Sequence, residues 1–159
     1  MSALSSVDGS SVPRARRVRA PGARGSRRRG AAPREPVWPR PGAEVLLAEL
    51  GGAPVGFALF FPNYSTFLAR PGLYLEDLFV LPSARGRGCG LALMSALARI
   101  AIERDYGRFE WSVLDWNRPA LDFYEQLGAH PRSEWTVQRL VGAPLAILAA
   151  YWSRPVPAP

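Results

Sequence analysis

A strand, a glycine-rich turn and a helix follow one another between residues 73 and 103, and they constrain the fold more than any other feature. Residues 73–81 (LYLEDLFVL) have the length and apolar content of a buried strand. The turn RGRGCG occupies residues 85–90, and residues 91–103 place apolar side chains at helical spacing. A helix start offers unpaired N–H groups and a positive dipole end, and glycines let the backbone approach an anion closely. The sequence therefore predicts a phosphate-bearing cofactor at this turn.

The spacing of the glycines separates this turn from two common phosphate loops. A Walker loop ends in Gly-Lys-Ser or Gly-Lys-Thr, and the chain contains no lysine. A dinucleotide fingerprint requires G-x-G-x-x-G, whereas the glycines here follow G-x-G-x-G and Leu91 takes the next place. The pattern that fits is R-x-x-G-x-G, through Arg85, Gly88 and Gly90.

Positive charge is concentrated at the amino-terminal end. Residues 1–40 hold ten arginines and two acidic residues, a formal +8, whereas residues 41–159 hold ten arginines and eleven acidic residues, a formal −1. The first segment is rich in Ser, Gly and Pro without apolar periodicity, so we expect a disordered tail. An inert extension, a tether to nucleic acid or a membrane surface, and a targeting peptide or mis-set start are its alternative readings, and nucleic-acid contact is not favoured.

Residues that build disulfides or zinc sites are scarce. Cys89 is the only cysteine and His130 the only histidine, so we expect no disulfide, no metal and a reducing, cytoplasmic location. Cys89 is interpreted as a small residue within the turn rather than a nucleophile, and His130 as structural. The longest apolar run, residues 143–152, is far short of the ~20 residues that span a bilayer.

Periodicity and turn residues predict the order β-β-β-α-β-α-β, an α/β mixed sheet. Predicted strands cover residues 44–50, 55–61, 73–81, 109–114 and 135–141. A Gly51-Gly52 turn joins the first two strands, and residues 62–72 form a longer loop.

Two helices are predicted. The apolar stripe of the first consists of Leu91, Met94, Leu97, Ala98 and Ala101. Asn117 caps the second helix and Gly128 ends it. Residues 144–152 fit either a helix or a strand. We therefore expect one domain over residues 41–152, followed by a disordered Pro-rich end at 153–159.

Three stretches in this order resemble the GNAT N-acetyltransferase superfamily, and within it the diamine acetyltransferase branch, which acts on spermidine, spermine, related amines or thialysine. They are LYLEDLFV (73–80), RGRGCG (85–90) and LDWNRPALDFYEQLGA (114–129). The resemblance covers roughly residues 45–140. It implies the acyl-CoA N-acyltransferase fold, acetyl-CoA as co-substrate, a small amine as acceptor, direct transfer and a homodimer. Compared with the family, the chain lacks a clear first strand and first two helices.

The resemblance also implies roles for individual residues. The cofactor would contact a strand edge and the pyrophosphate loop, at Leu78, Phe79, Val80, Arg85, Gly86, Arg87, Gly88, Cys89, Gly90 and Leu91. A second cofactor contact would come from Asn117, Arg118, Pro119 and Ala120. Tyr124 matches the tyrosine near the sulfur of acetyl-CoA. Glu76 matches the acidic residue at the amine site, and the acceptor pocket would be lined by Glu110, Trp111 and Ser112.

These residue types suit the chemistry. Glu76 can anchor an ammonium group and take its proton, Tyr124 can protonate a departing thiolate, and main-chain N–H groups can polarise a thioester carbonyl. Structural roles are the alternatives. Glu76 and Asp77 could be charges that protect a sheet edge, and Tyr124 could be an aromatic residue of the core. Because side chains alternate along a strand, only one of Glu76 and Asp77 can face a given site.

Two other readings of the whole protein stay open. One is a non-catalytic CoA-fold remnant or regulatory binder whose arginine-rich tail contacts nucleic acid or an anionic surface. The other is an enzyme of the same superfamily that acts on a different amine, such as a protein N-terminus or an antibiotic.

Overall fold

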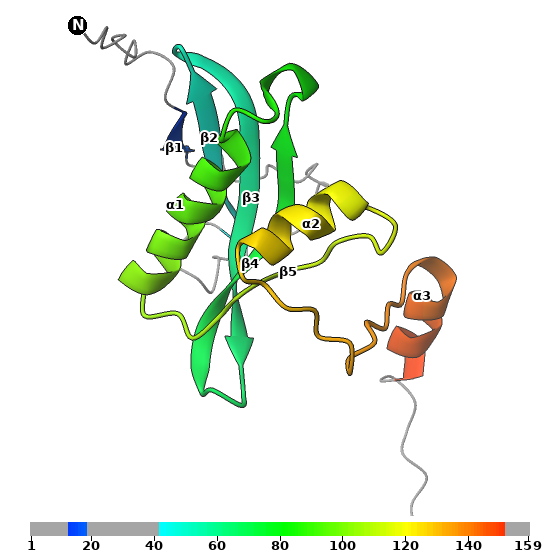
Figure 1. Cartoon of the computed structure of the whole chain (residues 1–159). Coiled ribbons are helices and arrows are strands. Elements are labelled where there is room, and N and C mark those ends of the chain that lie inside the picture. The colour runs from blue at the N-terminus through cyan, green and yellow to red at the C-terminus, as the bar shows by residue number, and fades with distance from the viewer. Residues whose placement is uncertain (1–12, 19–41, 152–159) are drawn as a thin grey trace, which may run out of the picture. The chain divides into compact units, whose positions relative to one another are not determined.

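The structure is a computed structural model that describes residues 13–18 and 42–151. The chain divides into two compact units, Met1–Val113 and Leu114–Pro159, which are described in turn. The elements of the described residues are, in order (Figure 1), β1 (Arg14–Val18), β2 (Glu44–Leu50), β3 (Ala53–Ser65), β4 (Arg70–Val80), a 3₁₀ turn η2 (Pro82–Ala84), α1 (Cys89–Glu103), β5 (Phe109–Trp111), α2 (Arg118–Gln126) and α3 (Gly142–Tyr151).

The first unit is built on a mixed sheet whose strands lie in the order β1-β2-β3-β4-β5. The first four strands are antiparallel neighbours, and β5 runs parallel to β4. The turn between β2 and β3 has φ values of 59° at Gly51 and 81° at Gly52, which glycine adopts without steric cost. The predicted mixed α/β architecture and this hairpin are confirmed.

Composition did not predict β1. Its residues pair with β2 in antiparallel register, from Arg14 opposite Glu49 to Val18 opposite Val45. The expected disorder of residues 1–40 therefore does not hold for residues 14–18, and a strand does precede the first hairpin. The reason is long-range, because a segment gains strand structure from its partner's edge and cross-strand charge pairs rather than from its own composition. The rest of that tail and the predicted disordered end, residues 153–159, lie outside the described residues.

The core of this unit lies between α1 and one face of the sheet (Figure 1). The sheet contributes Leu46, Ala58, Phe60, Leu73 and Leu75, and the helix contributes Cys89, Leu93, Met94, Leu97, Ile100 and Ala101. The helix begins two residues earlier than predicted. Its buried stripe is shifted accordingly, and Leu91, placed on that stripe by the sequence, is 51% exposed. Burial of this apolar face, about 25 cal/mol per Å², is the main term that holds helix and sheet together.

Glu44 is a buried charge that joins three elements of this unit. Its carboxylate accepts hydrogen bonds of 2.7 and 3.1 Å from Arg104, which directly follows α1, and pairs with Arg17 of β1. The Arg104 guanidinium also lies 5.9 Å from the ring centroids of Phe60 and Tyr106. Sequence reasoning missed this residue, because a glutamate at the start of a strand looks like a surface charge.

The predicted loop at residues 62–72 is largely wrong. β3 continues to Ser65 and β4 begins at Arg70, so only residues 66–69 form the turn. Pro62 is tolerated inside β3 because the pairing with β2 ends at Phe60, and the strand has an open side from there on.

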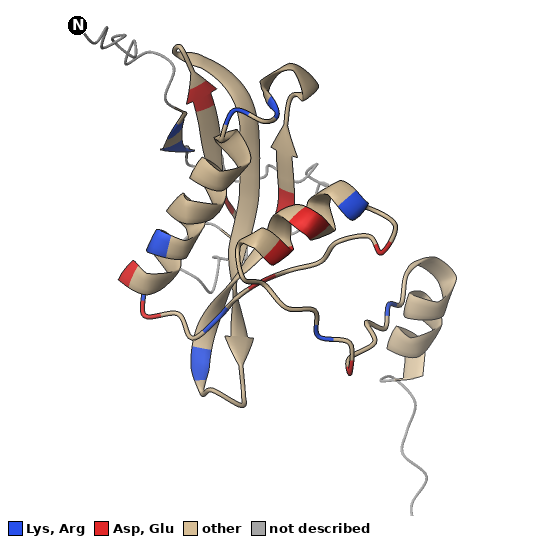
Figure 2. Cartoon of the chain, in the orientation of Figure 1, with Lys and Arg blue, Asp and Glu red and all other residues tan. Residues whose placement is uncertain are grey.

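The second unit contains α2 and α3. Gly128 ends α2 as predicted: its φ is +81°, its N–H donates to the Glu125 carbonyl, and the Ala129 N–H donates to the Tyr124 carbonyl. The ambiguous segment after residue 142 is a helix without charged side chains (Figure 2). Among the described residues, no helix is long and apolar enough to cross a membrane.

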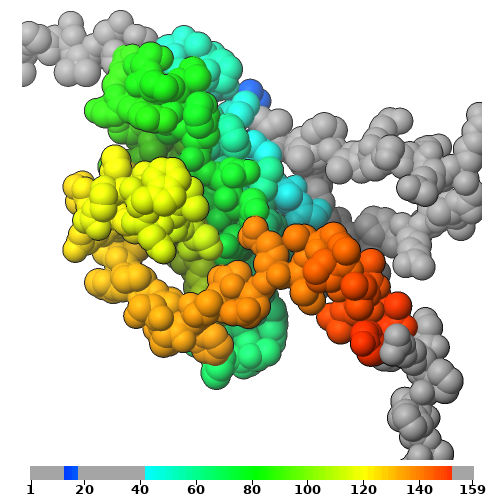
Figure 3. All heavy atoms as spheres, turned by 90° about the vertical axis from the view of Figure 1, so that its right-hand side faces the viewer, coloured from blue at the N-terminus to red at the C-terminus, as the bar shows by residue number. Residues whose placement is uncertain are grey.

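The predicted strand at residues 135–141 is wrong. These residues form no regular structure, and the whole segment 131–151 is exposed (Figure 3). The alternation of apolar and polar residues in WTVQRLV is a strand pattern, but β-propensity has an effect only when a partner edge pairs with the segment. No strand of the described residues pairs with it.

Candidate functional site

Glu76 occupies a β-bulge in β4. Leu75 lies opposite Phe60 and Asp77 opposite Leu59, so Glu76 is the extra residue without a partner in β3. A bulge shifts the alternation of side chains by one residue and often re-aims them beside a functional site. Tyr74 lies on the face of the sheet away from α1, and Glu76, two residues further along β4, lies on the same face. Asp77 lies opposite Leu59, which also belongs to that face. The expectation that only one of the two acids can face a given site is therefore wrong.

β4 and the edge strand β5 part at this bulge. The parallel pairing of β4 and β5 covers three rows, and its last row joins Leu75 to Trp111. From Asp77 to Val80, β4 pairs with β3 on one side and has no partner among the described residues on the other. Main-chain groups on that open side between Leu78 and Val80 can hydrogen-bond an amide-bearing ligand, apart from the Val80 carbonyl, which accepts a hydrogen bond from Arg85.

The glycine-rich turn leads from β4 into α1. Gly86 and Gly88 have φ values of 71° and 80°, and Gly88 is the residue that precedes the helix. The first helical bond runs from the Ala92 N–H to the Gly88 carbonyl, at 2.9 Å, so the N–H groups of the first helical turn, Cys89 to Leu91, have no acceptor within α1. A side chain at Gly86 would meet nothing within 4 Å. The turn therefore presents open space and free donors.

The electrostatics of the turn favour an anion. Figure 2 shows basic residues in the turn, which the sequence identifies as Arg85 and Arg87, and the first turn of α1 contains no acidic residue. Arg85 is fixed by a hydrogen bond of 3.1 Å from its Nε to the Val80 carbonyl, and Arg87 is exposed. These charges add to the positive end of the helix dipole.

Glu110 lies on β5 in a polar cluster with residues from two other strands. Its Oε2 lies 2.7 Å from Nε of Arg108 and accepts a hydrogen bond of 3.1 Å from Nδ2 of Asn63. Ser112, directly after β5, shares a hydrogen bond of 2.8 Å with the hydroxyl of Tyr74. Sequence reasoning placed Glu110 and Ser112 at the acceptor site but missed Asn63, Tyr74 and Arg108, whose positions depend on the register of three strands.

Trp111, the other predicted acceptor-site residue, lies on the same strand with a different neighbour. It is half-buried, and its ring centroid is 4.9 Å from that of Phe109. Alternation along β5 puts it on the face opposite Glu110 and Ser112. In the described part of the chain, no three His, Cys, Asp or Glu side chains gather in a way that could hold a metal ion.

The second unit carries the remaining predicted site residues. Asn117 precedes α2, and its carbonyl accepts hydrogen bonds from Ala120 and Leu121, at 3.1 and 3.0 Å. Pro119 occupies the first turn, where its missing N–H costs no hydrogen bond. Tyr124 is half-buried on α2, and this burial raises the pKa of its hydroxyl above the usual 10.0.

The predicted residues therefore fall into two groups. The first unit contains Glu76, the strand edge 78–80, the turn 85–91 and residues 110–112. The second contains Asn117, Pro119, Ala120 and Tyr124.

The chain is similar in sequence to curated proteins. The L-ornithine N5-acetyltransferase of Arabidopsis thaliana is 49% identical over 87 residues, which cover 55% of this chain and 38% of that protein. The thialysine N-epsilon-acetyltransferase of Sus scrofa is 37% identical over 113 residues, covering 67% of this chain and 66% of the relative. The chain thus spans less than two thirds of the length of these relatives.

Solved structures and a family model complete the comparison. An integron cassette protein from the mobile metagenome of V. cholerae is 36% identical, with a TM-score of 0.64 over 68% of this chain and 67% of that one. The sequence model of the Acetyltransferase (GNAT) family matches residues 16–129, from within β1 to just beyond α2. This chain therefore belongs to the GNAT acetyltransferase family.

Proposed function

We propose that the protein transfers an acetyl group from acetyl-CoA to a primary amine of a small polyamine, diamine or lysine-like substrate. The observation that carries the proposal is the glycine-rich turn at residues 86–91, which follows the open edge of β4 and ends in the N–H groups of the first turn of α1. Its relatives support the acceptor class, because their names include an ornithine acetyltransferase and thialysine acetyltransferases.

The residues of the first unit fit an acyl-CoA. The turn would hold the diphosphate through the backbone of Gly86 to Leu91, with Arg85 and Arg87 adding positive charge. The open edge of Leu78 to Val80 would pair with the amides of the pantetheine arm. Asn117, Pro119 and Ala120 are proposed as a second contact. When bound, acetyl-CoA supplies an acetyl group activated as a thioester.

Glu76 is proposed to receive the acceptor amine. A primary amine is protonated at neutral pH and cannot attack while it carries that proton. The bulge exposes the Glu76 carboxylate where β4 and β5 part, so it can bind the ammonium group and take its proton directly or through one water. Ser112 and Glu110 are proposed to position the rest of the acceptor, and Trp111 to support them.

Tyr124 is proposed as the group that protonates the departing sulfur. Because burial raises the pKa of Tyr124 above its usual value, its hydroxyl is protonated and can act as a donor throughout the neutral range. Tyr124→Phe should lower kcat by about 10²-fold, the usual contribution of a general acid, and leave the stabilisation by acetyl-CoA unchanged. Steady-state kinetics and a thermal melt with acetyl-CoA measure the two effects.

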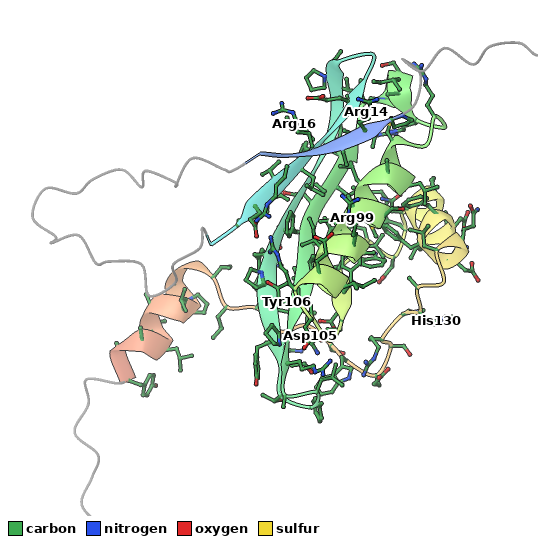
Figure 4. The ribbon with its side chains drawn as sticks, turned by 90° about the vertical axis from the view of Figure 1, so that its left-hand side faces the viewer. Arg14, Arg16, Arg99, Asp105, Tyr106 and His130 are labelled. Carbon is green, nitrogen blue, oxygen red and sulfur yellow. The ribbon has the colours of Figure 1, made fainter. Side chains whose placement is uncertain are left out.

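Tyr106→Phe is the matched control. Tyr106 is a half-buried tyrosine of the first unit whose ring stacks near Arg104, and the substitution keeps that ring (Figure 4). Its kcat should stay within about twofold of wild type. A Tyr124→Phe enzyme with full kcat would remove Tyr124 from the acid role.

An acetyl-transfer screen with the full chain tests the proposed activity. Release of the free thiol of coenzyme A is followed with ornithine, thialysine, spermidine, a peptide N-terminus and an aminoglycoside as acceptors. We expect turnover with one or more of the first three. Stabilisation by acetyl-CoA without turnover on any acceptor would favour the regulatory binder, and turnover on the last two alone would redirect the acceptor class. A cytoplasmic homodimer remains a prediction from the sequence.

A further inference from the structure

Two buried side-chain atoms in the described residues have no hydrogen-bond partner, and both belong to the cluster around Glu110. They are Oδ1 of Asn63, an acceptor, and Nε of Arg108, a donor. Nε of Arg108 lies 2.7 Å from Glu110 but at an angle that does not make a hydrogen bond. Native proteins leave few buried polar atoms without a hydrogen-bond partner, so each such atom indicates a possible site for a bound ligand.

The cluster is a compact arrangement of opposite charges on the face of the sheet away from α1. Nδ2 of Asn63 donates to Glu110, and an Nη2 bond of 3.3 Å to the Tyr64 carbonyl steadies Arg108. A Cβ atom on Gly72 would lie 2.4 Å from Oδ1 of Asn63 and 2.8 Å from Cγ of Arg108, so glycine is required beneath them. The side chains of Arg108 and Glu110 are 30% and 33% exposed, so a small ligand can reach their outer atoms, whereas Nε of Arg108 and Oδ1 of Asn63 are buried and become accessible only when these side chains rearrange around the ligand.

This pairing is complementary to the head group of a free α-amino acid. An α-ammonium group carries three donors and needs acceptors such as Glu110 and the unpaired Oδ1 of Asn63. An α-carboxylate needs donors, and the planar guanidinium of Arg108 supplies them in the geometry that carboxylates prefer. A cluster that served only to join β3 to β5 would account for neither unpaired atom.

The distance to Glu76 fits the side chain of such a ligand. Glu110 lies opposite Tyr74, and Glu76 is two residues further along β4 on the same face. Two strand residues span about 6.6 Å, close to the length of a short aliphatic chain that ends in an amine. A diamino acid with its head group at Glu110 would therefore place its terminal amine near Glu76.

We propose that Asn63, Arg108 and Glu110 form a head-group clamp that selects diamino acids over diamines of the same length. The proposal rests on the proposed function, because Glu76 marks the reacting end of the acceptor. A diamine lacks the carboxylate and leaves Arg108 without its ligand.

Equilibrium binding of two matched ligands tests the clamp directly. L-Ornithine and 1,4-diaminobutane differ only in the carboxylate, and each is titrated calorimetrically into the full chain with coenzyme A present. A charged hydrogen bond predicts that ornithine binds at least about tenfold more tightly. Affinities within twofold of each other would overturn the clamp. This comparison requires no variant and no turnover.

Variants then assign the preference to Arg108. Arg108→Gln should reduce the ratio of the two affinities, ornithine over 1,4-diaminobutane, to nearly one. Arg108→Lys keeps the positive charge but lacks the paired donors of the planar guanidinium, so it should retain part of the preference. Arg99→Gln is the matched control, since Arg99 lies on α1, is 75% exposed and forms an ion pair with Glu103 of the same helix (Figure 4). A preference that persists in Arg108→Gln would overturn the assignment.

The outcomes separate the clamp from the proposed function. If acetyl-CoA fails to stabilise the chain and no acceptor is acetylated, the transferase proposal fails while the ornithine preference can still be measured. If acetyl transfer occurs with equal affinity for both ligands, the clamp alone fails.

Discussion

Gly88→Val should abolish the stabilisation of this protein by acetyl-CoA. Gly88 has a φ of +80° and directly precedes α1, so its peptide is part of the row of donors that we propose for the diphosphate. A β-branched side chain there both disfavours the left-handed conformation and occupies the space in front of the donors. At 100 times the dissociation constant, acetyl-CoA should stabilise the wild type by about 2.7 kcal/mol, or roughly 5–10 °C in Tm. The variant should show no shift.

Gly52→Val separates loss of binding from backbone strain. Gly52 has a φ of +81°, nothing lies within 4 Å of its missing Cβ, and it sits in the hairpin between β2 and β3. The nearest atom to a Cβ on Gly88 is Cγ of Pro13, at 3.8 Å, so both sites have room and should lose a similar 1–2 kcal/mol, in order of magnitude. Only Gly88→Val should lose the acetyl-CoA shift. An unchanged shift in that variant would contradict the assignment of the turn.

The part of the site that sequence could predict is the part built from consecutive residues. The strand, turn and helix between residues 73 and 103 are specified by local signals: an apolar run, glycines at fixed spacing and helical periodicity. All three were located to within a few residues. The end of α2 at Gly128 was predictable for the same reason, because a left-handed residue closes a helix through bonds that reach back only a few positions.

The parts of the fold and of the site that the sequence did not predict depend on residues far apart in the chain. β1 forms because the edge of β2 pairs with it and two glutamates of β2 pair with its arginines. No property of residues 14–18 alone reveals β2 as the partner. The bulge at Glu76 follows from the register of β3, and the cluster of Asn63 with Arg108 and Glu110 from the register of three strands. Residues 135–141 show the converse, since their strand pattern has no partner edge in the described part of the chain.

Glu44→Gln should cost the protein about 3–5 kcal/mol of its free energy of unfolding, the usual penalty for breaking a buried ion pair from one side. Glutamine keeps the size of the side chain but cannot neutralise Arg104, which is only 13% exposed, or Arg17. The loss corresponds to a fall in Tm of roughly 10 °C and can be measured by denaturant or thermal unfolding. β1, β2 and the end of α1 should loosen together, which amide hydrogen exchange would detect as lost protection along β1.

Glu49→Gln provides the control on the same strand. Glu49 pairs with Arg16 across β1 and β2, but that arginine is 61% exposed, so the substitution should cost less than about 1 kcal/mol (Figure 4). A cost this small for Glu44→Gln would show that the Arg17–Glu44–Arg104 network does not stabilise the fold. Because the network lies at the opposite end of α1 from the glycine-rich turn, acetyl-CoA should still stabilise Glu44→Gln. The same ligand thus distinguishes a residue that holds the sheet and helix together from one that holds the cofactor.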